Sequence, residues 1–170
     1  MTTTPVRHPE LDEAFSLLHA GHLTRAKSLI QDFLKRRPTD VSGIRLLGDI
    51  AVKRGEFDAA AHLLERCLQL APDFHTLRKN YVLVLIQQHE LEKAAVEVDK
   101  LLAREPDNVN FLMMKGTILV RSGNHAAAID IYEHLIKDHP RLAPAQMNYG
   151  HSLRTVGRLD EAIQAYRKCI

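Results

Sequence analysis

The sequence predicts an all-α fold, a right-handed solenoid of antiparallel helix pairs in about five repeats. Two observations predict it. Apolar residues recur at helical spacing, for example between Gly48 and Gly55 and between Gly116 and Gly123. Residues of one type also recur at a fixed step of 34 positions. A period of this length is typical of repeat arrays whose units bury their apolar faces against one another.

Three columns of residues keep the 34-residue step. The prolines are Pro38, Pro72, Pro106 and Pro140. The alanines are Ala26, Ala60, Ala94, Ala128 and Ala162. The glycines are Gly21, Gly55, Gly123 and Gly157, with His89 in the vacant place. The step divides the chain into an N-terminal arm, 1–6, and five repeats: 7–40, 41–74, 75–108, 109–142 and the incomplete 143–170.

Each repeat reads as two helices. The first repeat has the most polar first helix, as expected of an end repeat that faces water. In the second, the first helix ends at Gly55, and a second helix over Phe57–Leu70 stops before Pro72. The third has His89 in place of the turn glycine, and the fourth repeats the pattern around Gly123. The fifth stops inside its second helix.

The alanine column predicts close approach of the two helices in each repeat, because alanine carries only a methyl group. Large apolar residues flank it in two further columns. One column is Ile30, Leu64, Val98, Tyr132 and Tyr166, and the other is Phe33, Cys67, Leu101, Leu135 and Cys169. Both cysteines are therefore expected to be buried and unreactive.

This pattern resembles the tetratricopeptide repeat (TPR) over residues 7–170. The matching features are the period, an aromatic residue four positions after an alanine, as in Ala128 and Tyr132, and the terminal proline. The column that usually holds Trp departs from the family and reads Glu10, Ile44, Arg78, Leu112 and Gln146.

A closer resemblance is carried by the stretches 46–60, 63–74 and 149–167, which look like the N-terminal repeats of bacterial TPR-sulfotransferases. In that family the repeats precede a sulfotransferase domain that uses a phosphoadenosine phosphosulfate donor. The resemblance implies a catalytic domain downstream of Ile170 and carries no catalytic residue onto this chain. The alternative is a stand-alone TPR adaptor with no associated enzyme.

The end of the array leads to the same choice. Ile163, Tyr166 and Ile170 have no following helix to cover them, and repeat arrays need a polar terminal element. We expect either that the chain is an N-terminal piece of a longer protein or that a partner or a second copy covers this end.

Composition and motifs argue against catalysis within these 170 residues. The net charge is +2, and the sequence has no phosphate-binding glycine motif and no spacing typical of a metal site, so no cofactor and no metal are expected. Two cysteines make no disulfide framework, and no signal peptide or membrane span is present. These features favour a cytoplasmic location.

TPR arrays resemble one another in lining a concave groove with the first helix of each repeat. On this resemblance, the candidate partner-binding residues are Arg45, Asp49, Lys53, Lys79, Asn80, Met113, Thr117, Arg121, Met147, His151 and Arg154. Five of them are cations and one is an acid. One interpretation is a groove for an acidic segment of a protein, of a peptide or of the chain's own downstream domain. The other is that long basic side chains only solvate a helix face.

Two partner classes are disfavoured. Chaperone-binding TPR domains hold carboxylates with a clamp of Lys, Asn and Arg, and of the corresponding positions here only Arg45 and Asn80 are compatible. Nucleic acid is disfavoured because no exposed aromatic side chain for base stacking is evident. End-to-end self-association remains an open alternative.

Overall fold

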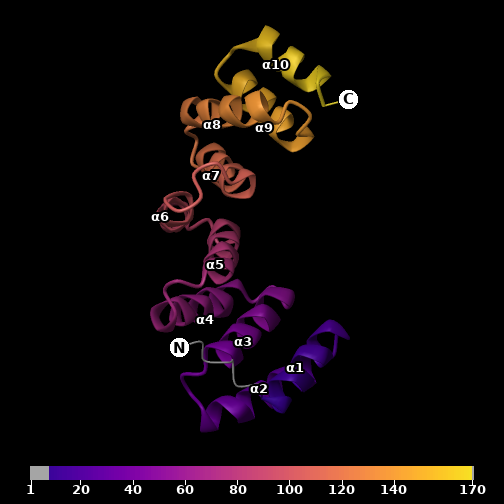
Figure 1. Cartoon of the computed structure of the whole chain (residues 1–170). Coiled ribbons are helices and arrows are strands. Elements are labelled where there is room, and N and C mark those ends of the chain that lie inside the picture. The colour runs from indigo at the N-terminus through magenta and orange to yellow at the C-terminus, as the bar shows by residue number, and fades with distance from the viewer. Residues whose placement is uncertain (1–7, 170) are drawn as a thin grey trace. The chain divides into compact units, whose positions relative to one another are not determined.

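The computed structural model describes residues 8–169 (Figure 1). The predicted arm, 1–6, and Ile170 lie outside the described residues. Within them the chain forms ten α-helices and no strand. The helices are α1 (Pro9–His19), α2 (Leu23–Arg36), α3 (Val41–Lys53), α4 (Phe57–Leu70), α5 (His75–Gln87), α6 (Leu91–Leu102), α7 (Val109–Arg121), α8 (His125–Asp138), α9 (Ala143–Thr155) and α10 (Leu159–Arg167). Ten helices are the number that five two-helix repeats require, so the predicted all-α repeat fold is confirmed.

The turn inside each repeat is set by one left-handed residue. Backbone φ is +82° at Gly21, +72° at Gly55, +79° at Gly123 and +85° at Gly157. His89 takes the same conformation with φ of +62°, which is uncommon for a residue with a side chain. The substitution in the glycine column therefore changes the residue but not the turn.

Polar caps fix where two of the first helices begin. The Asp40 carboxylate accepts a hydrogen bond from the Gly43 amide at 2.9 Å, ahead of α3. The Asn108 side chain accepts one from the Asn110 amide at 3.0 Å, ahead of α7. Each cap satisfies an amide that has no partner within its own helix.

The chain divides after Gln88 into two compact units. Unit 1 holds α1 to α5, and unit 2 holds α6 to α10. In unit 1 consecutive helices pack on one another, and α1 also contacts α3. Ala26 and Ala60 are fully buried between their helices, next to Ile30 and Leu64. The alanine column thus has the role that the sequence predicts.

Unit 2 packs its second helices tightly against glycines. A Cβ atom placed on Gly116 of α7 would lie 2.5 Å from Cζ of Tyr132, and one on Gly150 of α9 would lie 2.7 Å from Cε1 of Tyr166. The two tyrosine rings therefore occupy the space of the missing side chains. Helices α7 and α9 are also in contact with each other.

The two cysteines differ from each other. Cys67 is buried as expected, and burial raises the pKa of its thiol to about 11. The prediction that Cys169 is buried is wrong, because Cys169 is only half-buried. No described helix follows α10 to cover it.

Candidate partner-binding site

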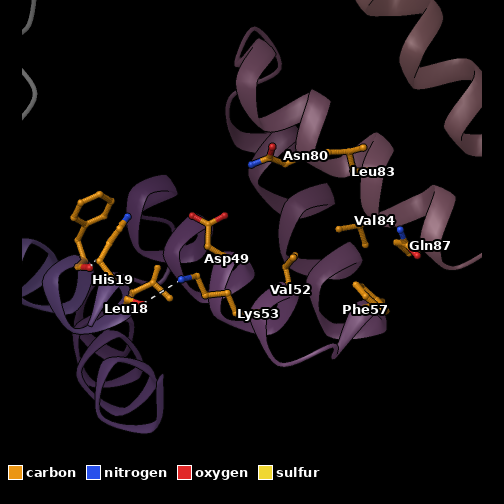
Figure 2. A pocket seen from close by; sticks show the side chains of 11 residues that line it. Leu18, His19, Asp49, Val52, Lys53, Phe57, Asn80, Leu83, Val84 and Gln87 are labelled. Atoms are coloured by element: carbon orange, nitrogen blue, oxygen red, sulfur yellow. Dashed lines mark hydrogen bonds between the residues drawn. The ribbon is translucent and has the colours of Figure 1, made fainter. Parts of the chain in front are cut away.

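A pocket of about 610 Å³ lies in unit 1, between first helices of successive repeats (Figure 2). Helices α1, α3 and α5 supply most of its wall, and α4 supplies its first residue. The lining residues are Phe15, Leu18, His19, Asp49, Val52, Lys53, Phe57, Asn80, Leu83, Val84 and Gln87. Most of these side chains are apolar, so the pocket favours apolar groups.

Three large apolar side chains of the pocket stay open to solvent. Phe15 is 47% exposed, Leu83 is 46% exposed and Val52 is 37% exposed. They come from α1, α5 and α3, and all three line the same pocket although each remains partly exposed to solvent. Gathered apolar surface of this kind is typical of a binding site for another molecule.

Phe15 also corrects one expectation from the sequence. Its exposed ring lies against the His19 ring, with ring centroids 4.1 Å apart. The prediction that the chain shows no exposed aromatic side chain is therefore wrong at this position.

The charges of the pocket are largely compensated. Nη1 of Arg45 lies 3.0 Å from Oδ2 of Asp49, one helical turn along α3. Burial raises the pKa of the Asp49 carboxyl, against the opposing effect of the Arg45 charge. The Lys53 ammonium donates a long hydrogen bond, 3.4 Å, to the carbonyl of Leu18. Because Arg45 is paired with Asp49, unit 1 attracts an acidic ligand less strongly than its cations alone would.

The predicted site residues divide between the two units. The pocket brings together Asp49, Lys53 and Asn80. Arg45 contacts the pocket only through Asp49, and Lys79 is half-buried on α5 outside the lining. The remaining candidates lie in unit 2, with Met113, Thr117 and Arg121 on α7 and Met147, His151 and Arg154 on α9.

Eight of the eleven lining residues are absent from the predicted set, and two of them have separate reasons. Phe57 is the first residue of α4, and the predicted groove is lined by first helices alone. Val84 directly follows Leu83 on α5 and is almost fully buried, so the helix pattern assigns it to the core. The signal for Phe57 is its place just after the left-handed turn at Gly55, where the second helix begins beside the first.

Unit 2 brings arginine and histidine side chains together in two groups. A guanidinium nitrogen of Arg121 lies 3.0 Å from Nε2 of His89. A guanidinium nitrogen of Arg154 lies 3.4 Å from Nδ1 of His151. The His125 ring meets the His151 ring edge-on at a centroid distance of 6.1 Å. We call these five residues, His89, Arg121, His125, His151 and Arg154, the cationic cluster.

Within residues 8–169 no group of three or more His, Cys, Asp or Glu side chains is placed to hold a metal ion. None of the helices in this range is both long and apolar enough to cross a membrane.

Two models of repeat families match the chain. A family model described as the cytochrome c-type biogenesis protein H TPR domain matches residues 29–146. A tetratricopeptide repeat model matches residues 143–170. No curated protein matches the chain.

Solved structures match over nearly the whole chain. A MamA structure, labelled AMB-1, has a TM-score of 0.82 and 26% identity, over 94% of this chain and 95% of that one. YrrB, described as a TPR protein with an unusual peptide-binding site, has a TM-score of 0.83 and 17% identity, over 95% and 84% of the two chains. MamA 41-end from Desulfovibrio magneticus RS-1 has a TM-score of 0.86 and 13% identity, over 94% and 90%. The last two likenesses are of fold alone.

Proposed function

Because the chain belongs to the family of the cytochrome c-type biogenesis protein H TPR domain, we propose that it is a non-catalytic scaffold that binds a segment of a partner protein in the pocket of unit 1. The TPR fold is a protein-interaction fold, and the fold neighbour YrrB is described as having a peptide-binding site. In this proposal, apolar side chains of the partner segment bind in the pocket.

The observation that carries the proposal is the convergence of Phe15, Val52 and Leu83. A partner side chain that enters the pocket removes apolar surface of all three from water. Burying one large apolar side chain stabilises a complex by roughly 1.5–3 kcal/mol. The anchor residue we expect is therefore a leucine, methionine or phenylalanine of the partner.

The acidic partner that the sequence predicts is proposed for a different part of the chain. In unit 1 the ion pair of Arg45 with Asp49 compensates one of the predicted cations. The half-buried carboxylate of Asp49 also repels a carboxylate that enters the pocket. Selectivity of this pocket for apolar, non-acidic segments follows from both effects.

Two proposals concern the protein to which the repeats belong. The first is an N-terminal region of a bacterial TPR-sulfotransferase, supported by the sequence resemblance. The second is a stand-alone adaptor, supported by the MamA structure, of which the matched part makes up 95%. The coding sequence after codon 170 distinguishes them, since only the first requires a following domain of several hundred residues with a phosphosulfate-binding loop. A cytoplasmic location belongs to both proposals, and fractionation of cells that produce the protein tests it.

A peptide-selection experiment tests the proposed pocket. Peptides are selected from a random phage-displayed library on the folded chain, and the affinity of the best peptide is measured for variants. Leu83→Glu puts a charge into the pocket and should weaken binding about tenfold or more. Val96→Glu changes another exposed apolar residue, on α6, and is the matched control.

The proposal requires selected peptides to share a large apolar residue and to lose affinity only with Leu83→Glu. Equal affinity for both variants would show that partner segments bind elsewhere. Both positions are exposed in the native chain, so we expect both variants to fold. Their urea unfolding midpoints check this.

A further inference from the structure

Charges in unit 2 are sorted between its helices. Helices α7 and α9 contain no aspartate or glutamate, and they carry Lys115, Arg121 and Arg154. The acidic residues of unit 2 lie on α6, α8, α10 and the connecting turns. The charged side chains of α7 and α9 therefore have one sign, which attracts an oppositely charged ligand.

The two arginines lie against histidine rings. A guanidinium nitrogen of Arg121 lies 3.0 Å from Nε2 and 3.3 Å from Nδ1 of His89, and one of Arg154 lies 3.4 Å from Nδ1 of His151. Neither arginine forms an ion pair with a carboxylate of the described residues, whereas Lys115 is paired with Asp99 at 2.7 Å. A carboxylate that took the place of the histidine ring as partner would form short, charge-assisted hydrogen bonds with each arginine.

The repeat itself supplies an internal control. A shift of two repeats, 68 residues, carries α3, α4 and α5 of unit 1 onto α7, α8 and α9 of unit 2, so the pocket residues of these three helices have equivalent positions there. At these positions Asp49 becomes Thr117, Phe57 becomes His125, and Leu83 becomes His151. The repeat therefore folds with apolar residues at the two positions where unit 2 has histidines. Packing of the repeat does not by itself require histidine at these positions.

His125 shows this most directly. Its Nδ1 atom is buried without a hydrogen-bond partner, at the position where unit 1 has the phenyl ring of Phe57. An unpaired buried nitrogen is unfavourable for stability, and a phenylalanine would avoid it. Compared with unit 1, unit 2 has no acid at Thr117 and has polar rings at His125 and His151. Both differences favour an anionic ligand.

We propose that the cationic cluster of unit 2 is a second recognition site, which binds carboxylate side chains in an acidic segment of a partner protein. The proposal rests on the proposed function only in taking a protein segment as the ligand. Arg121 and Arg154 provide the charge-assisted donors, and the histidines provide the polar surroundings. The two units thus select chemically different segments, apolar in unit 1 and acidic in unit 2.

Titration of the ¹⁵N-labelled 170-residue chain with a short peptide of alternating glutamate and glycine tests this site. The peptide with glutamine in place of glutamate is the control ligand. The measurement is made at low ionic strength, because the screening length is about 30 Å at 0.01 M salt. We expect amide shifts in the last turns of α7 and α9 with the glutamate peptide, reversed by added salt, and none with the glutamine peptide.

Charge reversal decides whether the effect is local. Arg121→Glu with Arg154→Glu should weaken binding about tenfold or more. Lys137→Glu with Arg167→Glu changes the net charge equally on α8 and α10, where both residues are exposed, and should weaken it about twofold or less. Arg121→Gln with Arg154→Gln, which removes the charge without adding repulsion, should fall between them.

Each result has one meaning. Equal weakening by the two reversals would overturn the proposal, because the net charge alone would then explain binding. Loss of stability without loss of peptide affinity would also overturn it, since both arginines would then act only on the helix C-termini. Tighter binding of oligothymidine than of the acidic peptide would overturn the partner class. Loss of apolar-peptide binding in Leu83→Glu, with acidic-peptide binding unchanged, keeps this test separate from the test of unit 1.

Discussion

Asp49 shows how one residue sets the character of a pocket. Its carboxyl group lies among apolar side chains and has Arg45 as its ion-pair partner. Burial outweighs that partner, so the pKa of the carboxyl is raised. The ionised form is therefore tolerated by the fold rather than favoured by it, which is consistent with a role toward ligands more than toward stability.

This imbalance predicts a pH-dependent difference between Asp49→Asn and the wild type. An acid whose pKa is higher in the folded state binds protons more readily when folded, so stability falls as pH rises through the window between its unfolded and folded pKa values. The unfolded value is about 3.9. The asparagine variant lacks this loss, so its urea midpoint should gain on the wild type from pH 3 upward and then level off.

The comparison of slopes removes the constant effect of the altered hydrogen bond to Arg45. Asp130→Asn, at an exposed position on α8, is the control and should show no such gain. A midpoint difference that stays the same from pH 3 to pH 7, or that moves toward the wild type, would contradict the imbalance.

At the scale of elements, the glycines on first helices of unit 2 fix how closely the second helices pack. Gly116 and Gly150 face tyrosine rings, whereas Gly48 at the same place in unit 1 faces Leu64. The close packing of α7 against α8, and of α9 against α10, therefore requires a glycine on the first helix of each pair. Arg121, His151 and Arg154 of the cationic cluster lie on these same first helices, α7 and α9.

We predict that Gly116→Ala destabilises the chain by about 1–3 kcal/mol, because the added Cβ overlaps the Tyr132 ring. Gly48→Ala is the matched control. Its Cβ would lie 3.3 Å from Cδ2 of Leu64, and alanine is the better helix former by about 1 kcal/mol, so we expect a small change of either sign. Urea unfolding measures both, and equal midpoints for the two variants would show that the tyrosine ring moves aside freely.

Helix ends were predictable from the sequence, and the pocket was predictable in part. Glycine and proline restrict the backbone locally, so the turns at Gly55 and Gly123 follow from residue type, and even His89 follows from the register. Asp49, Lys53 and Asn80 lie in the pocket as the first-helix pattern implies. Phe57 and the pairing of Arg45 with Asp49 depend on contacts between side chains, which a column of residues does not encode. The division into two units after Gln88 could not be predicted from the sequence, because the 34-residue step continues across it.

At the scale of the whole molecule, stability in a repeat protein is a sum over repeats and the interfaces between neighbours. In the described residues α10 has a neighbour on one side only, so fewer of its apolar groups are buried. Leu159 is 57% exposed and Ile163 is 49% exposed, whereas the equivalent Phe57 and Ile129 of earlier repeats are half-buried or buried. The helix has nine residues, a length that is marginal without tertiary support.

We therefore predict that α10 is the least protected helix in hydrogen exchange, with amides that exchange faster than those of α8 by about a hundredfold or more, as local opening near the frayed limit implies. A designed polar helix fused after Ile170 should cover Leu159 and Ile163, raise the protection of α10 and leave that of α3 unchanged. Leu159→Lys with Ile163→Lys is the complementary variant: it removes the exposed apolar surface, so any self-association through this face should disappear in sedimentation while the fold remains. Protection of α10 equal to that of α8 in a dilute monomer would contradict the prediction, because the one-sided packing of the last repeat would then carry no energetic deficit.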